Sequence, residues 1–255
     1  MIKFFRNIRK KLAAENKAVG YMRYAVGEIL LVVIGILIAL QVNDWNAKRN
    51  KQIEEQKALV NLKQDFSYNK EQLDSLILRT DFFVGKSLEV LEHTGKKTRP
   101  KTEEAFNKLL NNLATTPHYY PQNGFLDDLI NSGRLNIISN SQLRNKLSSW
   151  KPVLDYIKYR EELLTNYNVD IINYVIEHGS WLNVDEVSDF FTGFKFPKSG
   201  FDMDNRKLLE DVQFENMTEN HINFLLELKE KQERAQRLMV KIIALIEKEL
   251  KEYKQ

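Results

Sequence analysis

One apolar run, residues 24–42, constrains this chain more than any other feature. Its only strongly polar side chains are Glu28 and Gln41, and each lies near an end of the run. A helix of about 20 mostly apolar residues crosses the hydrocarbon core of a bilayer, which is about 30 Å thick. No later segment is comparable, because the apolar residues after it come singly or in short groups between charges. The sequence therefore predicts one transmembrane helix over residues 24–43.

The run is too long for the apolar core of a cleaved signal peptide. That core has about 7–15 residues and is followed by small residues at the cleavage site. Here the residues at positions 40–45 read Leu-Gln-Val-Asn-Asp-Trp and contain no such pair of small residues. The pattern favours an uncleaved signal anchor over a cleaved leader.

Charge on the two sides of the run predicts its orientation. Residues 1–24 carry seven basic side chains against one acidic, whereas the basic residues just beyond the run are offset by acidic neighbours. Basic residues are retained on the cytoplasmic side of a membrane. We therefore expect a single-pass protein of a bacterial inner membrane, with residues 1–23 in the cytoplasm and residues 44–255 in the periplasm.

The same charge distribution argues against a nucleic-acid partner. The whole chain has a net charge of +3, of which residues 1–24 contribute +6, so the remainder is at −3. A nucleic-acid-binding domain carries its basic excess on the fold itself. The basic tail suits the anionic lipid of the inner leaflet instead, at about 1 kcal/mol per basic residue. Phe5, Ile8 and Leu12 share one helical face and fit a short amphipathic segment there, although ordinary positive-inside charge explains the tail equally well.

The remainder of the chain reads as helical almost throughout. From residue 44 to about residue 93 there is no proline and one glycine, and apolar residues recur at a spacing of three and four. The polar Asn69, Thr80 and Ser87 fill the remaining positions of that face. This spacing is typical of a long amphipathic helix. A last helix with a similar pattern is predicted to begin at a cap formed by Asn216 and Glu219.

A third long helix is predicted between these two. Ser139 with Gln142 has the spacing of a capping box, and the helix it opens is expected to run to about His178. Pro152 lies inside this pattern, so we expect a break near residues 149–151.

Shorter elements complete the predicted order. Thr102 is expected to cap a short helix, and residues 115–123 are expected to form a loop. Another short helix follows and ends at Gly133. Residues 181–202 contain glycines, a proline and clustered phenylalanines, and are expected to form a long connection. The predicted fold is therefore all-α: one N-terminal transmembrane helix followed by an extracytoplasmic antiparallel bundle of long, coiled-coil-like helices.

The chain shows little that predicts chemistry. It has no cysteine, so disulfides and thiolate metal sites are excluded. Its four histidines form none of the recurrent zinc or di-metal spacings, and no phosphate-binding glycine motif or nucleophile elbow occurs. His93 and His178 each lie just before a glycine at a predicted helix end, where a cation suits the helix dipole. We therefore predict no enzymatic activity, no metal and no cofactor.

Two blocks of the sequence resemble a known family. They read MIKFFRNIRKKL followed by GEILLVVIGILIALQVNDWN, and FLDDLINSGRLNIISNSQLRNKLSSW. Together with the charged terminal helix, they resemble an uncharacterised family of single-pass membrane proteins from Gram-negative bacteria, catalogued as a domain of unknown function. The resemblance implies a helical exported domain on an N-terminal anchor, and it implies no activity.

Three residues inside the apolar run are candidates for helix association. Glu28 is an intramembrane carboxylate, which is by default a functional hypothesis, but it lies close enough to the headgroups to reach them. Gly35 and Ala39 are small residues four apart, a spacing that lets two membrane helices approach closely. Such residues are also common in spans that do not associate, so self-association and pairing with another membrane protein both stay open.

A loop outside the membrane is the best candidate for recognition. His118, Tyr119 and Tyr120 are followed by a proline, and Arg134 follows the turn at Gly133. Aromatic and polar residues on a loop form recognition surfaces, but they also form structural turns whose tyrosines pack on the fold. The sequence thus leaves two principal functions. One is a membrane-tethered interaction or sensing module, and the other is an envelope scaffold that self-associates; an enzyme is a distant third.

Overall fold

The computed structural model describes residues 7, 10, 18–188 and 193–252, and these residues confirm the all-helical prediction. No strand occurs among them. The expected amphipathic face of Phe5, Ile8 and Leu12 lies outside the described residues. In chain order the elements are α2 (Ala18–Leu91), α3 (Glu103–Leu113), α4 (Gly124–Asn131), the 3-10 helix η1 (Arg134–Ile137), α5 (Ser141–Ser148), α6 (Trp150–His178), α7 (Trp181–Glu186), the 3-10 helix η2 (Asn205–Glu210) and α8 (Val212–Glu252).

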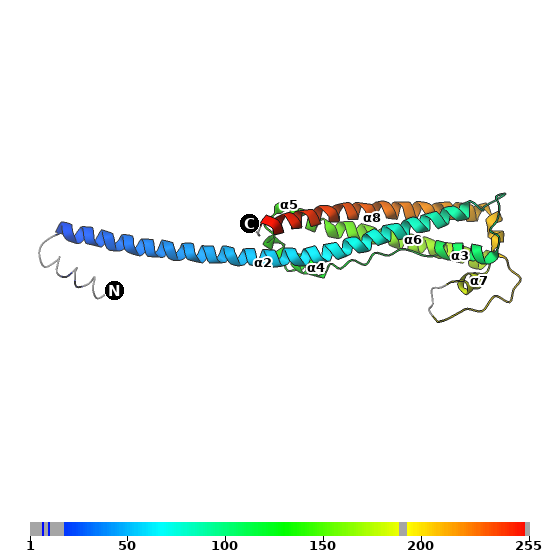
Figure 1. The fold of residues 1–255 in the computed structure, drawn as a ribbon, viewed down its shortest axis with the longest axis horizontal. Coiled ribbons are helices and arrows are strands. Elements are labelled where there is room, and N and C mark those ends of the chain that lie inside the picture. The colour runs from blue at the N-terminus through cyan, green and yellow to red at the C-terminus, as the bar shows by residue number, and fades with distance from the viewer. Residues whose placement is uncertain (1–6, 8–9, 11–17, 189–192, 253–255) are drawn as a thin grey trace. The chain divides into compact units, whose positions relative to one another are not determined.

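The chain divides into two compact units, residues 1–57 and residues 58–255. Helix α2 is a single unbroken helix whose residues belong to both units (Figure 1). Its first part is long and apolar enough to cross a membrane, and none of its most apolar stretch is buried within the protein. The second unit contains all the other elements.

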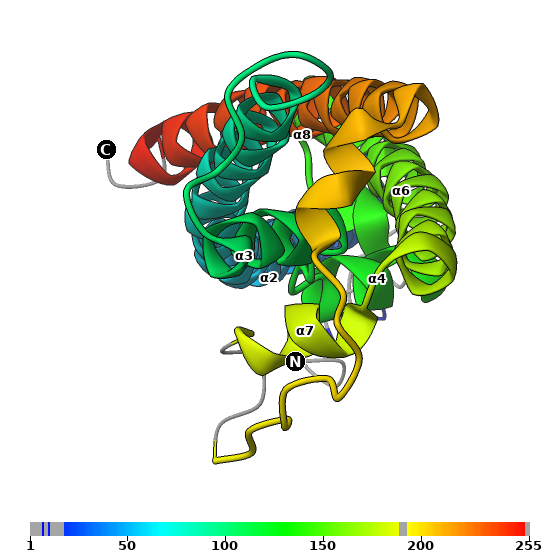
Figure 2. The same ribbon diagram turned by 90° about the vertical axis from the view of Figure 1, so that its right-hand side faces the viewer.

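The long helices of the second unit lie side by side (Figures 1 and 2). Polar contacts fix the register of α8 on α2: Lys63 pairs with Glu247 at 2.8 Å, and Thr80 bonds Gln232 at 2.9 Å. In these two contacts the position on α8 falls as the position on α2 rises. Helix α6 packs against α8 in the same unit.

Two hydrophobic clusters form the core of this unit. The larger lies along α2, α6 and α8, and in it the ring of Phe66 lies 5.4 Å from that of Trp150. The smaller gathers residues of α3, α6 and α8 with the two segments between α6 and α8, and Phe106 packs there on Phe214 at 6.2 Å. The apolar positions that the three-and-four spacing selected on α2 are buried in these clusters: Leu59, Leu62, Phe66, Leu73, Leu76, Phe83 and Val90.

Several predicted boundaries are confirmed. Thr102 caps α3, since its side chain accepts a hydrogen bond from the backbone of Ala105. The break near Pro152 falls at Ser149, between α5 and α6. Gly133 follows α4 with φ at 70°, a left-handed conformation that favours glycine.

Two predicted caps are wrong. The cap of α5 is Asn140 rather than Ser139, because the Asn140 side chain is the one that reaches the N–H of Leu143. Helix α8 begins at Val212, so Asn216 lies inside it. Asp211 accepts a hydrogen bond from the backbone of Gln213 and starts that helix earlier than the predicted cap.

The connection predicted over residues 181–202 is more structured than expected. It opens with α7, which Ser180 caps and which packs on α3. Asn205, which follows it, is wholly buried, and its side-chain oxygen lies 2.5 Å from where a Cβ on Gly179 would stand. Glycine is therefore required where α6 ends, because any side chain there would displace Asn205.

Candidate functional site

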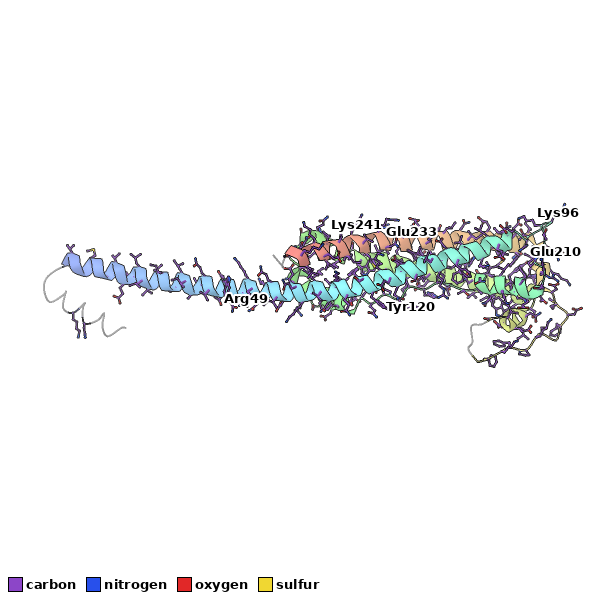
Figure 3. All side chains as sticks on the ribbon, in the orientation of Figure 1. Arg49, Lys96, Tyr120, Glu210, Glu233 and Lys241 are labelled. Carbon is purple, nitrogen blue, oxygen red and sulfur yellow. The ribbon has the colours of Figure 1, made fainter. Side chains whose placement is uncertain are left out.

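The loop before α4 is fixed by long-range hydrogen bonds. The backbone N–H of Tyr119 donates to Glu161 Oε1 at 2.8 Å, and the Tyr119 hydroxyl donates to the carbonyl of Asn69 at 3.0 Å. Tyr119 is buried, whereas Tyr120 is 80% exposed and lies on the outside of the bundle (Figure 3). The two adjacent tyrosines therefore differ: Tyr119 anchors the loop and Tyr120 is available to a partner.

Asn69 of α2 holds the same loop from the other side. Its side-chain oxygen accepts from the backbone N–H of Gln122 at 2.7 Å, and its amide nitrogen donates to the carbonyl of Gln122 at 2.8 Å. Both backbone groups of one loop residue are thus paired by one buried side chain. The sequence placed Asn69 on the seam of α2, but it gave no sign of a partner more than fifty positions away.

A cavity of about 490 Å³ opens beside this loop. One wall is formed by His118, Tyr119, Tyr120 and Pro121, and the other comes from α6: Leu154, Asp155, Ile157, Lys158, Glu161 and Glu162. The α6 wall carries three acidic side chains and one lysine. The cavity combines an exposed aromatic ring with apolar and acidic groups, which is the composition of a binding surface rather than of a packed core.

Glu161 is the least exposed charged group of this cavity, at 5%. Burial raises the pKa of its carboxyl group, and the hydrogen bonds from the Tyr119 N–H and from His118 oppose that rise. His118 Nδ1 lies 3.3 Å from Glu161 Oε2. The pair therefore fixes the start of the loop against α6, and the hydroxyl of Tyr119 is already engaged by Asn69.

Arg134 is not brought to this cavity. It lies exposed on η1 and is not among the residues that line the space beside Tyr120. The predicted recognition set therefore separates into two parts, with His118, Tyr119 and Tyr120 gathered at one cavity and Arg134 elsewhere on the surface.

The three candidates on the apolar part of α2 lie on its surface. Gly35 and Ala39 are exposed, and a Cβ built on Gly35 meets no atom within 4 Å. Glu28 is half-buried.

One buried histidine, His221, was not among the candidate site residues predicted from the sequence. His221 of α8 is wholly buried, and its Nδ1 lies 3.0 Å from Ser87 Oγ, which also bonds the carbonyl of Phe83. The amide of Asn168, turned to satisfy its neighbours, donates to His221 Nε2 at 3.3 Å. Burial lowers the pKa of His221 to about 4. Both ring nitrogens are thus paired in a neutral imidazole, and the residue joins α2, α6 and α8.

Metal binding has no obvious location in the described part of the chain. Within it, no group of three or more histidine, aspartate or glutamate side chains is placed to hold an ion. His178 lies in the last turn of α6 and His93 just beyond α2, as the sequence predicted.

The described residues define an all-helical protein with one N-terminal helix long and apolar enough to span a membrane. The chain belongs to a family described as a family of unknown function (DUF6090), whose pattern matches residues 28–227. Comparison with curated proteins found no match, and comparison with solved structures found none. Membership of this family therefore identifies no activity.

Proposed function

We propose that this chain is a membrane-tethered interaction or sensing module without catalytic activity, which binds a partner through the surface around Tyr120. One observation carries the anchor: every large apolar side chain of α2 between Val26 and Val42 is exposed. Transfer of one such side chain from water to an apolar environment is favourable by about 1.5–3 kcal/mol. Exposure of the whole stretch to water is therefore strongly unfavourable, and its transfer into lipid is favourable. No periodic face distinguishes one side of this stretch from another, as expected for a helix surrounded by lipid.

The proposed topology follows from charge. The basic excess of residues 1–24 favours a cytoplasmic N-terminus in the inner membrane of a Gram-negative cell, with the bundle in the periplasm. The opposed register of α8 on α2 supports an antiparallel, coiled-coil-like bundle as the exported domain. In this proposal the basic tail contacts anionic lipid, and Glu28 contacts headgroups or a second membrane protein.

The loop cavity supports the recognition role. Tyr120 is exposed on a loop whose neighbours are held by buried contacts to Asn69 and Glu161, so the ring is presented from a fixed backbone. Aromatic side chains on fixed loops commonly carry much of the binding energy of an interface. Arg134 is a second exposed position and belongs to a separate part of the surface.

Site-specific photo-crosslinking in membranes tests this proposal. A photoreactive residue replaces Tyr120 in the full-length chain, and the matched control carries it at Lys241, which is also exposed but lies on α8 (Figure 3). The proposal expects a discrete adduct with another protein from position 120 and not from position 241. The adduct should weaken in Glu161→Ala, which frees the loop, and persist in Glu177→Ala, which removes an exposed carboxylate of α6 outside the cavity.

The other outcomes have defined meanings. Adducts made only between copies of this chain would favour the second candidate, a self-associating scaffold, and Gly35→Leu and Ala39→Leu would then be expected to abolish them. Absence of any adduct at position 120 would contradict the recognition role. If Glu28→Gln and Gly35→Leu left both assembly and partner capture unchanged, the route through the membrane helix would be dropped.

A further inference from the structure

A row of polar side chains joins the core of the bundle to the loop before α4, which carries Tyr120. It runs from His221 of α8 through Asn168 of α6 to Thr116, which lies just beyond the end of α3. His221 and Asn168 are buried, with exposed fractions of 0% and 2%. Buried polar groups that are fully paired hold a core in one specific arrangement. The row therefore connects α8 to the start of the loop through defined hydrogen bonds.

The hydrogen bonds around His221 determine which ring nitrogen carries the hydrogen. Ser87 Oγ donates its single hydrogen to the carbonyl of Phe83 at 2.9 Å, so the same oxygen accepts from His221 Nδ1 at 3.0 Å. Nε2 of the neutral ring then has no hydrogen and can only accept. It accepts from the amide nitrogen of Asn168 at 3.3 Å. The orientation of the Asn168 amide is therefore matched to a neutral ring.

The same amide also completes the last turn of α3. The carbonyl of Leu113 has no donor within the helix, because the residue four positions further on is Pro117, which lacks an N–H. Asn168 supplies the donor at 3.2 Å, and its nitrogen also bonds the carbonyl of Leu164 at 3.1 Å. Its oxygen accepts from the hydroxyl of Thr116 at 3.0 Å. One side chain thus holds both the end of α3 and the first residues of the loop.

A proton on Nε2 of His221 is incompatible with this arrangement. The new N–H faces the amide hydrogens of Asn168, so two donors oppose each other. If the amide turns over, its oxygen accepts from Nε2 and its nitrogen donates to Thr116 Oγ1 at 3.0 Å. That oxygen then faces the carbonyls of Leu113 and Leu164, which lose their donor. Either orientation leaves buried polar groups unsatisfied, which is costly.

We propose that His221, Asn168 and Thr116 form a proton-sensitive relay that positions the loop bearing Tyr120. The proposal rests on the recognition role of that loop and names its regulation. With a neutral ring, Asn168 holds the start of the loop against α6 and the end of α3. With a charged ring these bonds are lost and Tyr120 shifts from its position. His221 acts here as a positioning residue, since it is not among the residues that line the cavity beside Tyr120.

The titratable side chains on the elements around His221 have other partners or are exposed. They are Glu161, Tyr167 and Asp170 of α6, Lys86 and Glu89 of α2, Glu215 and Glu219 of α8, and His118 of the loop. None of these groups bonds the ring, and burial is the cause that lowers the pKa of His221 to about 4. The ring therefore takes up a proton only as the pH falls toward that value.

The test follows the ring, the amide and the loop in the full-length chain in nanodiscs. Isotope-labelled histidine and asparagine give NMR signals for the His221 ring and the Asn168 amide. The chain has no cysteine, so Tyr120→Cys carries an environment-sensitive fluorophore at a unique site. The proposal expects all three signals to change together, with a midpoint near pH 4, while the far-ultraviolet circular dichroism stays helical.

Variants assign the change to the relay. His221→Asn cannot titrate and should abolish the response of the fluorophore. Thr116→Val removes one hydroxyl at the start of the loop, so it should leave the titration of the His221 ring in place and diminish the response of the fluorophore. His178→Asn is the matched control, because it removes an exposed histidine of α6, and it should respond as the parent chain does.

Three results would overturn the proposal. The first is titration of the His221 ring with no change at Asn168 or at the fluorophore. The second is a response that survives in His221→Asn, and its loss in His118→Asn would assign it to the pair of His118 and Glu161. The third is loss of helical circular dichroism with the same midpoint, which would indicate unfolding of the bundle.

These measurements need no partner protein. Absence of adducts from position 120 would contradict the recognition role, but it would leave the three coupled signals unchanged. Absence of coupling would contradict the relay and leave the adducts in place. The two proposals can therefore fail separately.

Discussion

Two stretches of the same helix, α2, differ in the exposure of their apolar side chains. Between Val26 and Val42 every large apolar side chain is exposed, with exposed fractions of 44–65%. Beyond Ala58 the apolar residues at a spacing of three and four are buried, while Val60 and Leu78 between them face outward. The comparison teaches that a continuous apolar run marks the part of the helix that needs lipid, whereas apolar residues at a spacing of three and four between polar ones mark the part that packs on protein.

The first and largest expected effect comes from removing a buried ring in the second stretch. Phe66→Ala should lower the free energy of unfolding of the bundle by about 3–5 kcal/mol, because it leaves a cavity beside Trp150. Ile36→Ala, in the exposed stretch, is the matched control and should leave that free energy nearly unchanged. Chemical denaturation of the full-length chain in mild detergent measures both. Equal losses would remove the contrast between the stretches.

Second, charge placed in the two stretches should act on different properties. Ile34→Arg puts a cation near the middle of the apolar run and should oppose membrane insertion by about 2.5–3.5 kcal/mol. Val60→Arg, at an exposed position of the second stretch, should insert like the parent chain and remain folded. Membrane fractionation after alkaline extraction measures insertion. Release of neither variant would contradict the assignment of residues 24–43 to the bilayer.

A third prediction concerns the polar part of the buried seam. Burial lowers the pKa of His221 to about 4 from an ordinary 6.5. Below pH 6.5 the unfolded chain therefore binds a proton that the folded chain does not, and the free energy of unfolding falls by up to about 1.4 kcal/mol per pH unit as the pH drops toward 4. His221→Asn cannot titrate, so it should lose this slope.

Denaturation of the parent and His221→Asn at neutral and mildly acidic pH measures the difference. Glu161, whose pKa is raised by burial, contributes a slope of the opposite sign, but it is present in both chains and drops out of the comparison. Identical pH dependence in the two chains would show that His221 is not held neutral by burial.

The smallest effect on stability is expected from an exposed ion pair of the second stretch. Lys63 and Glu247 form a pair at 2.8 Å with both side chains substantially exposed. Exposed pairs of this kind contribute little to stability, because water and salt screen the two charges. Lys63→Ala should therefore change the free energy of unfolding far less than Phe66→Ala does, and the change should shrink in high salt. A loss as large as that of Phe66→Ala would indicate that this pair, and not the apolar seam, fixes the register.

Local patterns in the sequence predicted much of the fold. The spacing on α2, the cap at Thr102, the turn at Gly133 and the break before Pro152 each depend on a few neighbouring residues, so each could be read directly. The caps of α5 and α8 were predicted at the wrong residues because several polar side chains near each helix start are able to cap it. In the structure the side chains of Asn140 and Asp211 accept the hydrogen bonds from the free N–H groups.

The candidate site could be predicted only in part. Its loop and the exposed Tyr120 follow from sequence, but the partners of the loop do not, since Asn69 and Glu161 lie more than forty positions from it. The hydrogen bond from Asn107 to the carbonyl of Asn183 is likewise long-range. Pairing between distant polar residues carries no periodic signal, which is why the spacing of apolar residues could not reveal it.

Cysteine accessibility tests the central claim, a bundle held outside the membrane by one span, most directly. The chain has no cysteine, so Lys10→Cys and Tyr120→Cys each introduce one reporter, expressed separately in a Gram-negative host. A membrane-impermeant maleimide is added to intact spheroplasts. The account predicts that position 120 is labelled and that position 10 is labelled only after lysis. Labelling of position 10 with protection of position 120, or recovery of the chain in the soluble fraction, would contradict it.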